Sequence, residues 1–508
     1  MFKGIIFFAL ALLLSACGGG GGGGGGGSSG PAPTPPADPS VLVDTTVYSA
    51  ASGDSLASAT EAAAVTTHTL GTLAYTATVG HLNAGTPTKA SMFYAAYTAE
   101  GAGATTARPI IFFYNGGPGS ASLWLHLASW GPQRLVTNNP ATHIALSPSL
   151  VDNPQSLLAL ADLVFVDAVG TGYSEAVAPN TNRSFWGVDA DAAVFRDFVL
   201  RYTAKTGRTS APIVLFGESY GGLRTPILAQ ALLAAGAPLQ GIVLQSAILN
   251  YNSNCAVVDP GRLSCAAFIP SYGATAAWFQ LAKPQPSDLP LFVQAVANAV
   301  TGTFEPAIQA FLSQHLPLAT AVTQQLADLS GLPAASWQAN PLLGPTTLRT
   351  NLLPGQLLGR YDSRVVAANG SALASEGDPS STVITATFRS AIAAQLTALK
   401  YQAATAYTLS NDAAIGQWTW AHDGNALPDA IPDLALALAL KPSLKLLVIG
   451  GYHDLATPFR LTETDLARLG AAPPGLTLKR YTGGHMTYLD DSVRPGMAAD
   501  LNAWLKGL

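Results

Sequence analysis

The stretch Ala211–Gly236, APIVLFGESYGGLRTPILAQALLAAG, joins a short apolar run to a glycine-bounded turn and then to a stretch with helical apolar periodicity. At the turn, Gly217-Glu218-Ser219-Tyr220-Gly221 matches the pattern G-x-S-x-G. A serine on a tight strand-to-helix bend has strained backbone angles, and only small neighbours let the strand and the helix approach each other. Its Oγ is then held clear of the sheet, and the next N–H and the helix N-terminus face a developing oxyanion. The pattern therefore predicts a nucleophile at Ser219, the alternative being a chance loop.

Composition excludes one class of partner. Charged residues make up only 11% of the 508 residues, the net charge is −5, and no basic run is present. Nucleic-acid binding depends on clustered positive charge. We therefore expect no nucleic-acid partner.

The N-terminus reads as an export signal. Residues 1–16 contain Lys3 and an apolar run to Leu14 that is too short to span a bilayer permanently. Small residues before Cys17 resemble the bacterial lipobox, in which the cysteine becomes the acylated N-terminus. Residues 17–40 then read as a Gly/Pro-rich tether. We expect a bacterial cell-envelope protein held at the membrane by lipid on Cys17, facing the periplasm or the surface; the alternative is an ordinary secretory signal with an incidental cysteine.

The remaining cysteines are Cys255 and Cys265. Outside the cytosol a disulfide between them is the natural expectation, and two free buried thiols are the alternative. No second cysteine or histidine pair has zinc-ligand spacing, so we expect neither a metal site nor a cofactor.

Strand-like and helical patterns alternate along much of the chain. After an expected antiparallel pair at 68–79 and 91–99, apolar runs at 109–114, 162–169, 211–217, 239–246, 444–450 and 476–481 read as strands. Such alternation predicts an α/β fold with a mostly parallel central sheet and helices on both faces, its ligands lying at the carboxyl ends of the strands. The region 251–440 lacks comparable strands and predicts a mainly helical cap insertion between residues 41–250 and 441–508 of the main domain.

An elbow serine needs a base and an acid that orients the base. The histidines after Ser219 are His315, His422, His453 and His485. His485 follows a strand through Gly483-Gly484, which suits a base that reaches the serine; His315 and His453 are expected to be structural. Asp454 lies just after the strand at 444–450 and can fix the tautomer of His485. Asp167 ends an earlier strand but precedes the serine, so it ranks second.

A second N–H for the oxyanion is expected from a loop after an earlier strand. Asn115-Gly116-Gly117-Pro118-Gly119 directly follows the strand at 109–114. Its glycines allow the backbone to approach a substrate, and Asn115 offers an amide. A plain glycine turn is the alternative.

Together these motifs resemble the serine carboxypeptidases, peptidase family S10. The resemblance rests on Asn115–Gly119, VGTGYS at 169–174, the GESYGG elbow, the Asp454 loop and GGHM at 483–486, and it runs from about Arg108 to the C-terminus. It implies an α/β-hydrolase fold and removal of C-terminal residues from a peptide substrate. It implies the site residues as follows: Ser219, Asp454 and His485 as the triad, the N–H groups of Gly117 and Tyr220 as the oxyanion hole, and Asn115, the Gly116 N–H and Glu218 as the site for the terminal carboxylate.

The carboxylate role has a physical basis. Two carboxylates a hydrogen bond apart cannot both ionise cheaply, so Glu218 and the substrate must share a proton. The chain departs from the better-known eukaryotic members at Ser129, where they carry a second glutamate, and at Phe113, where they carry tryptophan. Both departures alter the carboxylate network and bear on the acidic optimum.

Two other functions share parts of this pattern. Esterases and acyltransferases use the same acyl-enzyme and differ in what attacks it, so fold and triad do not separate them. A lipid-anchored binding protein on a silent hydrolase scaffold is the non-enzymatic reading, which the intact Ser219, Asp454 and His485 disfavour.

Overall fold

The central sheet is built outward from β10 (Ile213–Glu218), the strand that leads into the elbow. The computed structural model describes residues 38–101, 107–141, 147–257 and 262–508, and the packed unit begins at Ser40. The strand order is β16-β15-β11-β10-β5-β8-β4-β3-β2, with β9 beside β4. The other strands of this sheet are β2 (Ala63–Leu70), β3 (Leu73–Ala84), β4 (Ala90–Ala99), β5 (Ile110–Tyr114), β8 (Asp162–Val166), β9 (Glu175–Ala176), β11 (Leu239–Gln245), β15 (Lys445–Gly451) and β16 (Leu476–Tyr481).

The half of the sheet that carries the chemistry is parallel. Strands β16, β15, β11, β10, β5 and β8 pair in parallel, whereas β4 pairs antiparallel with β8 and continues into β3 and β2. Parallel strands bring their carboxyl ends to one edge, which gathers the loops that follow β5, β8, β10, β15 and β16. The predicted α/β-hydrolase architecture is confirmed.

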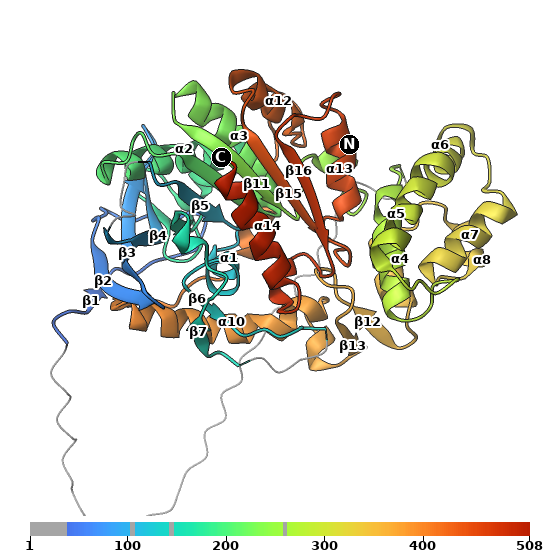
Figure 1. Cartoon of the computed structure of the whole chain (residues 1–508), viewed down its shortest axis with the longest axis horizontal. Helices are drawn as coiled ribbons and strands as arrows, with labels where there is room; N and C mark the ends of the chain where they lie inside the picture. Colours follow the sequence, from blue (N-terminus) through green and yellow to red (C-terminus); the bar gives the residue numbers. More distant parts are fainter. Residues whose placement is uncertain (1–37, 102–106, 142–146, 258–261) are drawn as a thin grey trace, which may run out of the picture. The chain divides into compact units, whose positions relative to one another are not determined.

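Helices cover both faces of this sheet (Figure 1). Along β5, Ile111 and Phe113 belong to one apolar core, and Ile110, Phe112 and Tyr114 to the other. Successive side chains of a strand point to opposite faces, so a strand buried on both sides reads as an unbroken apolar run. The first core contains α1 (Leu123–Ala128), α10 (Pro379–Ala398) and α14 (Arg494–Lys506), and the second contains α2 (Val188–Lys205), α3 (Tyr220–Ala234) and α12 (Ile431–Leu440).

The expected strand at 68–79 is wrong in its boundaries. Residues 63–70 form β2 and residues 73–84 form β3, and the two strands pair antiparallel in register Leu70↔Leu73. The turn between them contains Gly71 at φ 59°, a left-handed conformation that glycine adopts without a Cβ penalty. The alternation of polar and apolar residues continues through this turn, and that continuity masked it.

The region 251–440 divides between two packing environments. Six helices contribute to smaller clusters that also include Tyr452, Leu455 and Phe459: α4 (Ile269–Trp278), α5 (Leu289–Ala299), α6 (Glu305–Gln314), α7 (Thr320–Ser330), α8 (Ala334–Ala339) and α9 (Pro345–Asn351). Helices α10 and α12 instead pack into the two cores of the main sheet, and β14 (Tyr401–Ala403) pairs with β1 (Leu42–Asp44). Parts of residues 251–440 therefore pack with the main sheet, and the cap insertion stays a prediction.

Small structures complete the unit. Short two-stranded pairs join β6 (Gln133–Leu135) to β7 (Leu150–Asp152) and β12 (Gln356–Leu358) to β13 (Val366–Ala368). Helices α11 (Asp412–Gln417) and α13 (Phe459–Ala467) lie in connecting segments. Cys255 and Cys265 are joined in a disulfide. Across the described ranges, no helix is both long enough and apolar enough to cross a membrane.

Candidate active site

Ser219 sits on the strained bend between β10 and α3. Its backbone has φ 62° and ψ −122°, a conformation that L-residues adopt only where the surroundings demand it. The surroundings demand it here because backbone and side chains crowd the turn. A Cβ on Gly217 would lie 2.3 Å from the Gly221 carbonyl oxygen, and one on Gly222 would lie 2.2 Å from the Ala247 Cβ. The small residues of the motif are therefore required by close packing.

His485 and Asp454 meet at the same edge of the sheet. Asp454 follows β15, His485 follows β16, and the Asp454 Oδ2 lies 2.8 Å from the His485 Nδ1. The Asp454 Oδ1 accepts from the backbone N–H groups of Ala456 at 2.7 Å and Thr457 at 3.0 Å. Both residues are buried. The acid is thus held from one side by its own loop and presents its other oxygen to the histidine.

Thr457 is a member of this site that the sequence analysis missed. Its Oγ1 lies 3.0 Å from both the His485 Nδ1 and the Asp454 Oδ2, and it donates to the Ser246 carbonyl at 2.7 Å. The Ser246 hydroxyl in turn donates to the His485 carbonyl at 2.6 Å. These contacts fix the position of the ring and of its backbone. The position of Thr457 three residues after Asp454 was the available signal, because an aspartate commonly caps the backbone two or three residues ahead.

His485 shares a cavity with Ser219. The cavity has a volume of about 220 Å³ and is lined among others by Asn115, Gly117, Glu218, Ser219 and His485. Burial disfavours the protonated ring, but the Asp454 carboxylate and the charge of Glu218 outweigh it, so the pKa of His485 is raised above its ordinary value. The raised pKa strengthens His485 as a proton acceptor.

The glycine loop after β5 lies against the elbow. A Cβ on Gly116 would lie 2.4 Å from the Tyr220 backbone nitrogen, and Gly117 has φ 103°. Any larger residue at Gly116 would displace the loop from the elbow. The loop therefore brings the backbone of Gly117 beside the Ser219–Tyr220 turn, where N–H groups could stabilise an oxyanion.

Asn115 and Glu218 form a buried pair next to the nucleophile. The Asn115 Nδ2 donates to the Glu218 Oε1 at 2.7 Å, and the Asn115 Oδ1 accepts from the Leu125 N–H at 3.1 Å. Burial raises the pKa of Glu218 to about 7, against the opposing effects of the His485 charge, the Asn115 hydrogen bond and the nearby Tyr488 hydroxyl. The carboxyl can therefore carry a proton near neutrality.

A buried ion pair supports Asn115 from behind. The Arg224 Nη1 donates to the Asn115 carbonyl at 3.0 Å, and the Arg224 Nε lies 2.6 Å from the Asp191 Oδ2. Both side chains are almost fully buried. This support comes from α2 and α3, and no short motif in the sequence indicated it.

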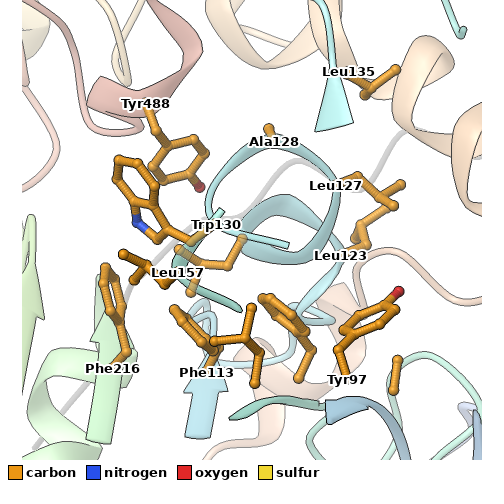
Figure 2. Close-up of a cluster of buried hydrophobic side chains, with 14 of the residues drawn as sticks. Tyr97, Phe113, Leu123, Leu127, Ala128, Trp130, Leu135, Leu157, Phe216 and Tyr488 are labelled. Atoms are coloured by element: carbon orange, nitrogen blue, oxygen red, sulfur yellow. The ribbon is translucent and has the colours of Figure 1, made fainter. Parts of the chain in front are cut away.

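Two residues depart from the carboxypeptidase pattern. Phe113 packs against other aromatic rings, and Ser129 bonds to its own helix. Figure 2 shows Phe113 beside Phe216, in the apolar cluster that also contains Trp130 and Tyr488. The Phe113 ring lies between the rings of Phe165 and Phe216, with centroids 4.6 and 4.9 Å away. The Ser129 hydroxyl donates to the Leu125 carbonyl of its own helix. Neither residue supplies a second carboxyl to the site.

Other candidate residues lie elsewhere. Asp167 accepts from the Ser122 N–H at 2.7 Å and the Tyr407 hydroxyl at 2.6 Å, and burial raises its pKa to about 6. His453 is buried, neither ring nitrogen has a partner among the described residues, and burial lowers its pKa to about 3. His315 ends α6. Cys17, the expected lipidation site, lies outside the described residues.

His422 belongs to the single candidate ion-binding group in the described parts of the chain, with Asp423 and Asp433. Its ring nitrogens already face carboxylates, at 2.6 Å from the Asp189 Oδ1 and 3.0 Å from the Asp433 Oδ2. An ion would have to replace these contacts. His422 therefore acts as a hydrogen-bonded link between two carboxylates.

Known proteins resemble this chain in sequence and in fold. The family model for serine carboxypeptidase matches residues 69–260. A pheromone-processing carboxypeptidase, KEX1, from Cryptococcus gattii is 34% identical over 141 residues, which are 27% of this chain and 20% of that protein. Serine carboxypeptidase S10 family member 1 from Dictyostelium discoideum is 29% identical over 149 residues, 29% of this chain and 33% of that protein. The chain thus aligns with a third or less of the length of these relatives.

A solved structure supports the fold. The crystal structure of Kex1(delta)p, a prohormone-processing carboxypeptidase from Saccharomyces cerevisiae, superposes with a TM-score of 0.53 at 17% identity, covering 84% of this chain and 91% of the other. The sequence match contains the glycine loop and the elbow, whereas Asp454 and His485 lie beyond residue 260. The chain is thus similar to serine carboxypeptidases in sequence over residues 69–260, and it shares the fold of one of them over most of its length.

Proposed function

We propose that this protein is a serine-type carboxypeptidase that releases C-terminal residues from peptides. The carrying observation is the buried Asn115–Glu218 pair in the same cavity as Ser219 and His485. A general esterase needs the nucleophile, the base and the oxyanion donors. A protonatable carboxyl with an amide donor beside the nucleophile has a use when the substrate itself ends in a carboxylate.

Acylation in this proposal uses the triad and the oxyanion donors. His485 takes the proton of the Ser219 hydroxyl as Oγ attacks the last peptide carbonyl, and the Gly117 and Tyr220 N–H groups stabilise the oxyanion. Asp454 holds the ring and stabilises its positive charge. The C–N bond then breaks as His485 gives its proton to the leaving amine. The products of this step are an acyl-Ser219 ester and the free C-terminal amino acid.

Deacylation uses the same groups with water. His485 takes a proton from water as its oxygen attacks the ester carbonyl, and the C–Oγ bond breaks. The proton passes back to the Ser219 oxygen, and the shortened peptide leaves with a new carboxylate. Glu218 and Asn115 hold the terminal carboxylate during the first step, and so align the last peptide bond with Ser219.

The test is a time course by mass spectrometry on a peptide set, each peptide as the free acid and as the C-terminal amide. We expect stepwise loss of residues from the free acids and much slower cleavage of the amides. Ser219→Ala should lower kcat by about 10⁶-fold and serves as the control for contaminating peptidases. Equal cleavage of acid and amide forms at every pH would favour an esterase or acyltransferase instead. No labelling of Ser219 by a fluorophosphonate would favour a silent binding protein.

We also propose that the protein is a lipoprotein of the bacterial cell envelope. The support is the N-terminal sequence: a charged and apolar leader, small residues before Cys17, and the Gly/Pro-rich residues that follow. In this proposal residues 1–16 are removed and Cys17 carries the lipid. The peptidase then acts close to the membrane on peptides in the envelope.

A further inference from the structure

Tyr488 lies directly behind the carboxylate site and has no role in the mechanism described above. It belongs to the single helical turn Thr487–Leu489, three residues after His485. The side chain is fully buried, and Figure 2 places its ring beside Trp130. The Arg494 Nη1 donates to its backbone carbonyl at 2.9 Å. The ring is therefore held in place by packing and by its own main chain.

The Tyr488 hydroxyl faces two groups of the carboxylate site, the Glu218 carboxyl and the Asn115 amide. At the separation in the structure, neither the Tyr488 hydroxyl nor the Glu218 Oε2 forms a hydrogen bond of regular geometry with any described residue. A buried donor and a buried acceptor without other partners are each costly alone. The Tyr488 hydroxyl and the Glu218 Oε2 are therefore a complementary donor and acceptor.

The other hydrogen-bonding groups that influence Glu218 have partners of their own. Asn115 bonds to Oε1, and the Ser129 hydroxyl is occupied by the Leu125 carbonyl. The titratable groups that face Glu218 are His485, Asp454, Tyr488 and, more weakly, Tyr361. His485 is engaged with Asp454. Among the titratable groups that face Glu218, Tyr488 is therefore the one free to donate to this oxygen.

We propose that Tyr488 is a positioning residue for carboxylate recognition, whose hydroxyl donates to the Glu218 Oε2. It would replace the second glutamate that the better-known members carry at the position of Ser129. With Asn115 donating to one oxygen and Tyr488 to the other, each oxygen keeps a lone pair, and one of these carries the proton shared with the substrate. This inference rests on the proposed carboxypeptidase function. It goes further by naming a donor that does not titrate where the better-known members carry a second acid.

A tyrosine donor at this position has a specific effect on the pH dependence of carboxylate binding. Burial and the charge of Glu218 raise the pKa of Tyr488 well above 10, so the hydroxyl keeps its proton at every working pH. Its hydrogen bond favours the ionised form of Glu218 and so opposes the effect of burial on that pKa. Carboxylate binding in this protein should thus follow one titration, that of Glu218.

The test uses Tyr488→Phe in the full chain, with free-acid peptides and a small neutral ester. We expect KM for the free-acid peptide to rise on the order of tenfold, as for loss of a hydrogen bond to a charged group. We expect the alkaline fall of kcat/KM to move to higher pH, because Glu218 loses a partner that lowers its pKa. The ester rates should stay unchanged. Tyr272→Phe is the matched control, since Tyr272 is equally buried and donates to the Leu343 carbonyl in the helical region.

Proton uptake gives a readout that does not depend on turnover. Ser219→Ala protein is titrated with a free-acid peptide by calorimetry in two buffers of different ionisation enthalpy, with and without Tyr488→Phe. The pH at which uptake is half-maximal should rise in the double variant. In a Glu218→Gln background, Tyr488→Phe should have no further effect on KM.

Each outcome decides a different claim. Unchanged KM, pH profile and proton uptake in Tyr488→Phe would overturn this inference alone. Equal losses on peptide and ester would also overturn it, since they indicate a general structural role. Absence of proton uptake in the protein with native Tyr488, together with equal binding of acid and amide peptides, would overturn the proposed function and this inference with it.

Discussion

Asp454 acts through its two oxygens, and each oxygen has a separate task. Oδ1 accepts two backbone N–H groups of its own loop, and Oδ2 faces His485. A donor cannot occupy the first position without losing those hydrogen bonds. The loop therefore dictates which atom of any substituted side chain faces the histidine.

This division predicts the effect of Asp454→Asn. The amide oxygen should take the place of Oδ1, so the NH2 group points at the His485 Nδ1 and forces the tautomer with a proton on Nε2. That tautomer cannot accept the Ser219 proton, and kcat should fall by about 10⁴-fold with little change in KM. Steady-state kinetics on peptide and ester check it. Asp167→Asn is the control, and a greater loss there than in Asp454→Asn would move the orienting role to Asp167.

If the protein acts as proposed, Glu218 should determine the pH range for peptides but not for esters. Its pKa is raised to about 7 by burial, so the protonated form that can bind a carboxylate exists below that pH and disappears above it. We expect kcat/KM for free-acid peptides to fall as pH rises through about 7. Glu218→Gln keeps a donor without a titrating proton and should flatten this fall.

The control for Glu218→Gln is the neutral ester. Its rate depends on His485 being unprotonated, so it should fall on the acid side in both proteins, and the raised pKa of His485 places that fall above its ordinary range. If the alkaline fall for peptides persists in Glu218→Gln, another group binds the carboxylate.

His422 contacts the first turns of two helices, α2 and α12. His422 contacts Asp189 of α2 and Asp433 of α12, and these contacts raise its pKa despite burial. Because the His422 pKa is higher in the folded than in the unfolded protein, its ion pairs contribute fully to stability below the unfolded pKa of 6.5. This contribution is lost as the pH rises through the folded pKa.

His422→Gln should remove this pH dependence. The melting temperature of the unmodified protein should exceed that of the variant most clearly at and below pH 6.5, and the difference should narrow as pH rises through the folded pKa. Calorimetric melting at several pH values measures it. His315→Asn is the control, because His315 has φ 57° at the end of α6 and asparagine tolerates that conformation. Parallel melting curves for protein and His422→Gln across the range would contradict the assignment.

For the chain taken together, the attachment to a membrane depends in our proposal on the side chain of Cys17. Acyl chains bind bilayers through about 0.8 kcal/mol per buried CH₂, so several chains hold a protein firmly where none would hold it at all. Cys17→Ser should therefore release the protein to the soluble fraction or leave it with its leader uncleaved. Fractionation and mass spectrometry of the N-terminus measure both. Cys255→Ser with Cys265→Ser is the control, and unchanged membrane association of Cys17→Ser would contradict the lipoprotein proposal.

Local steric demands are the part of this protein that the sequence by itself determined. The elbow at Ser219 and the loop at Gly116 can be predicted because two backbones approach so closely there that only glycine fits. The glycines are close together in the chain, so they form a motif that is visible in the sequence. The buried strands can be predicted because a strand buried on both faces has an unbroken run of apolar residues. The α/β-hydrolase fold follows from these two signals.

Only the tertiary structure decided which distant residues meet. Thr457 and Ser246 support His485, Arg224 supports Asn115, and Tyr488 faces Glu218 across large separations in the sequence. The same holds for α10 and α12, whose apolar periodicity predicts helices but does not say which core they cover. Periodicity reports that a face is buried, whereas the identity of its partner depends on how the whole chain packs.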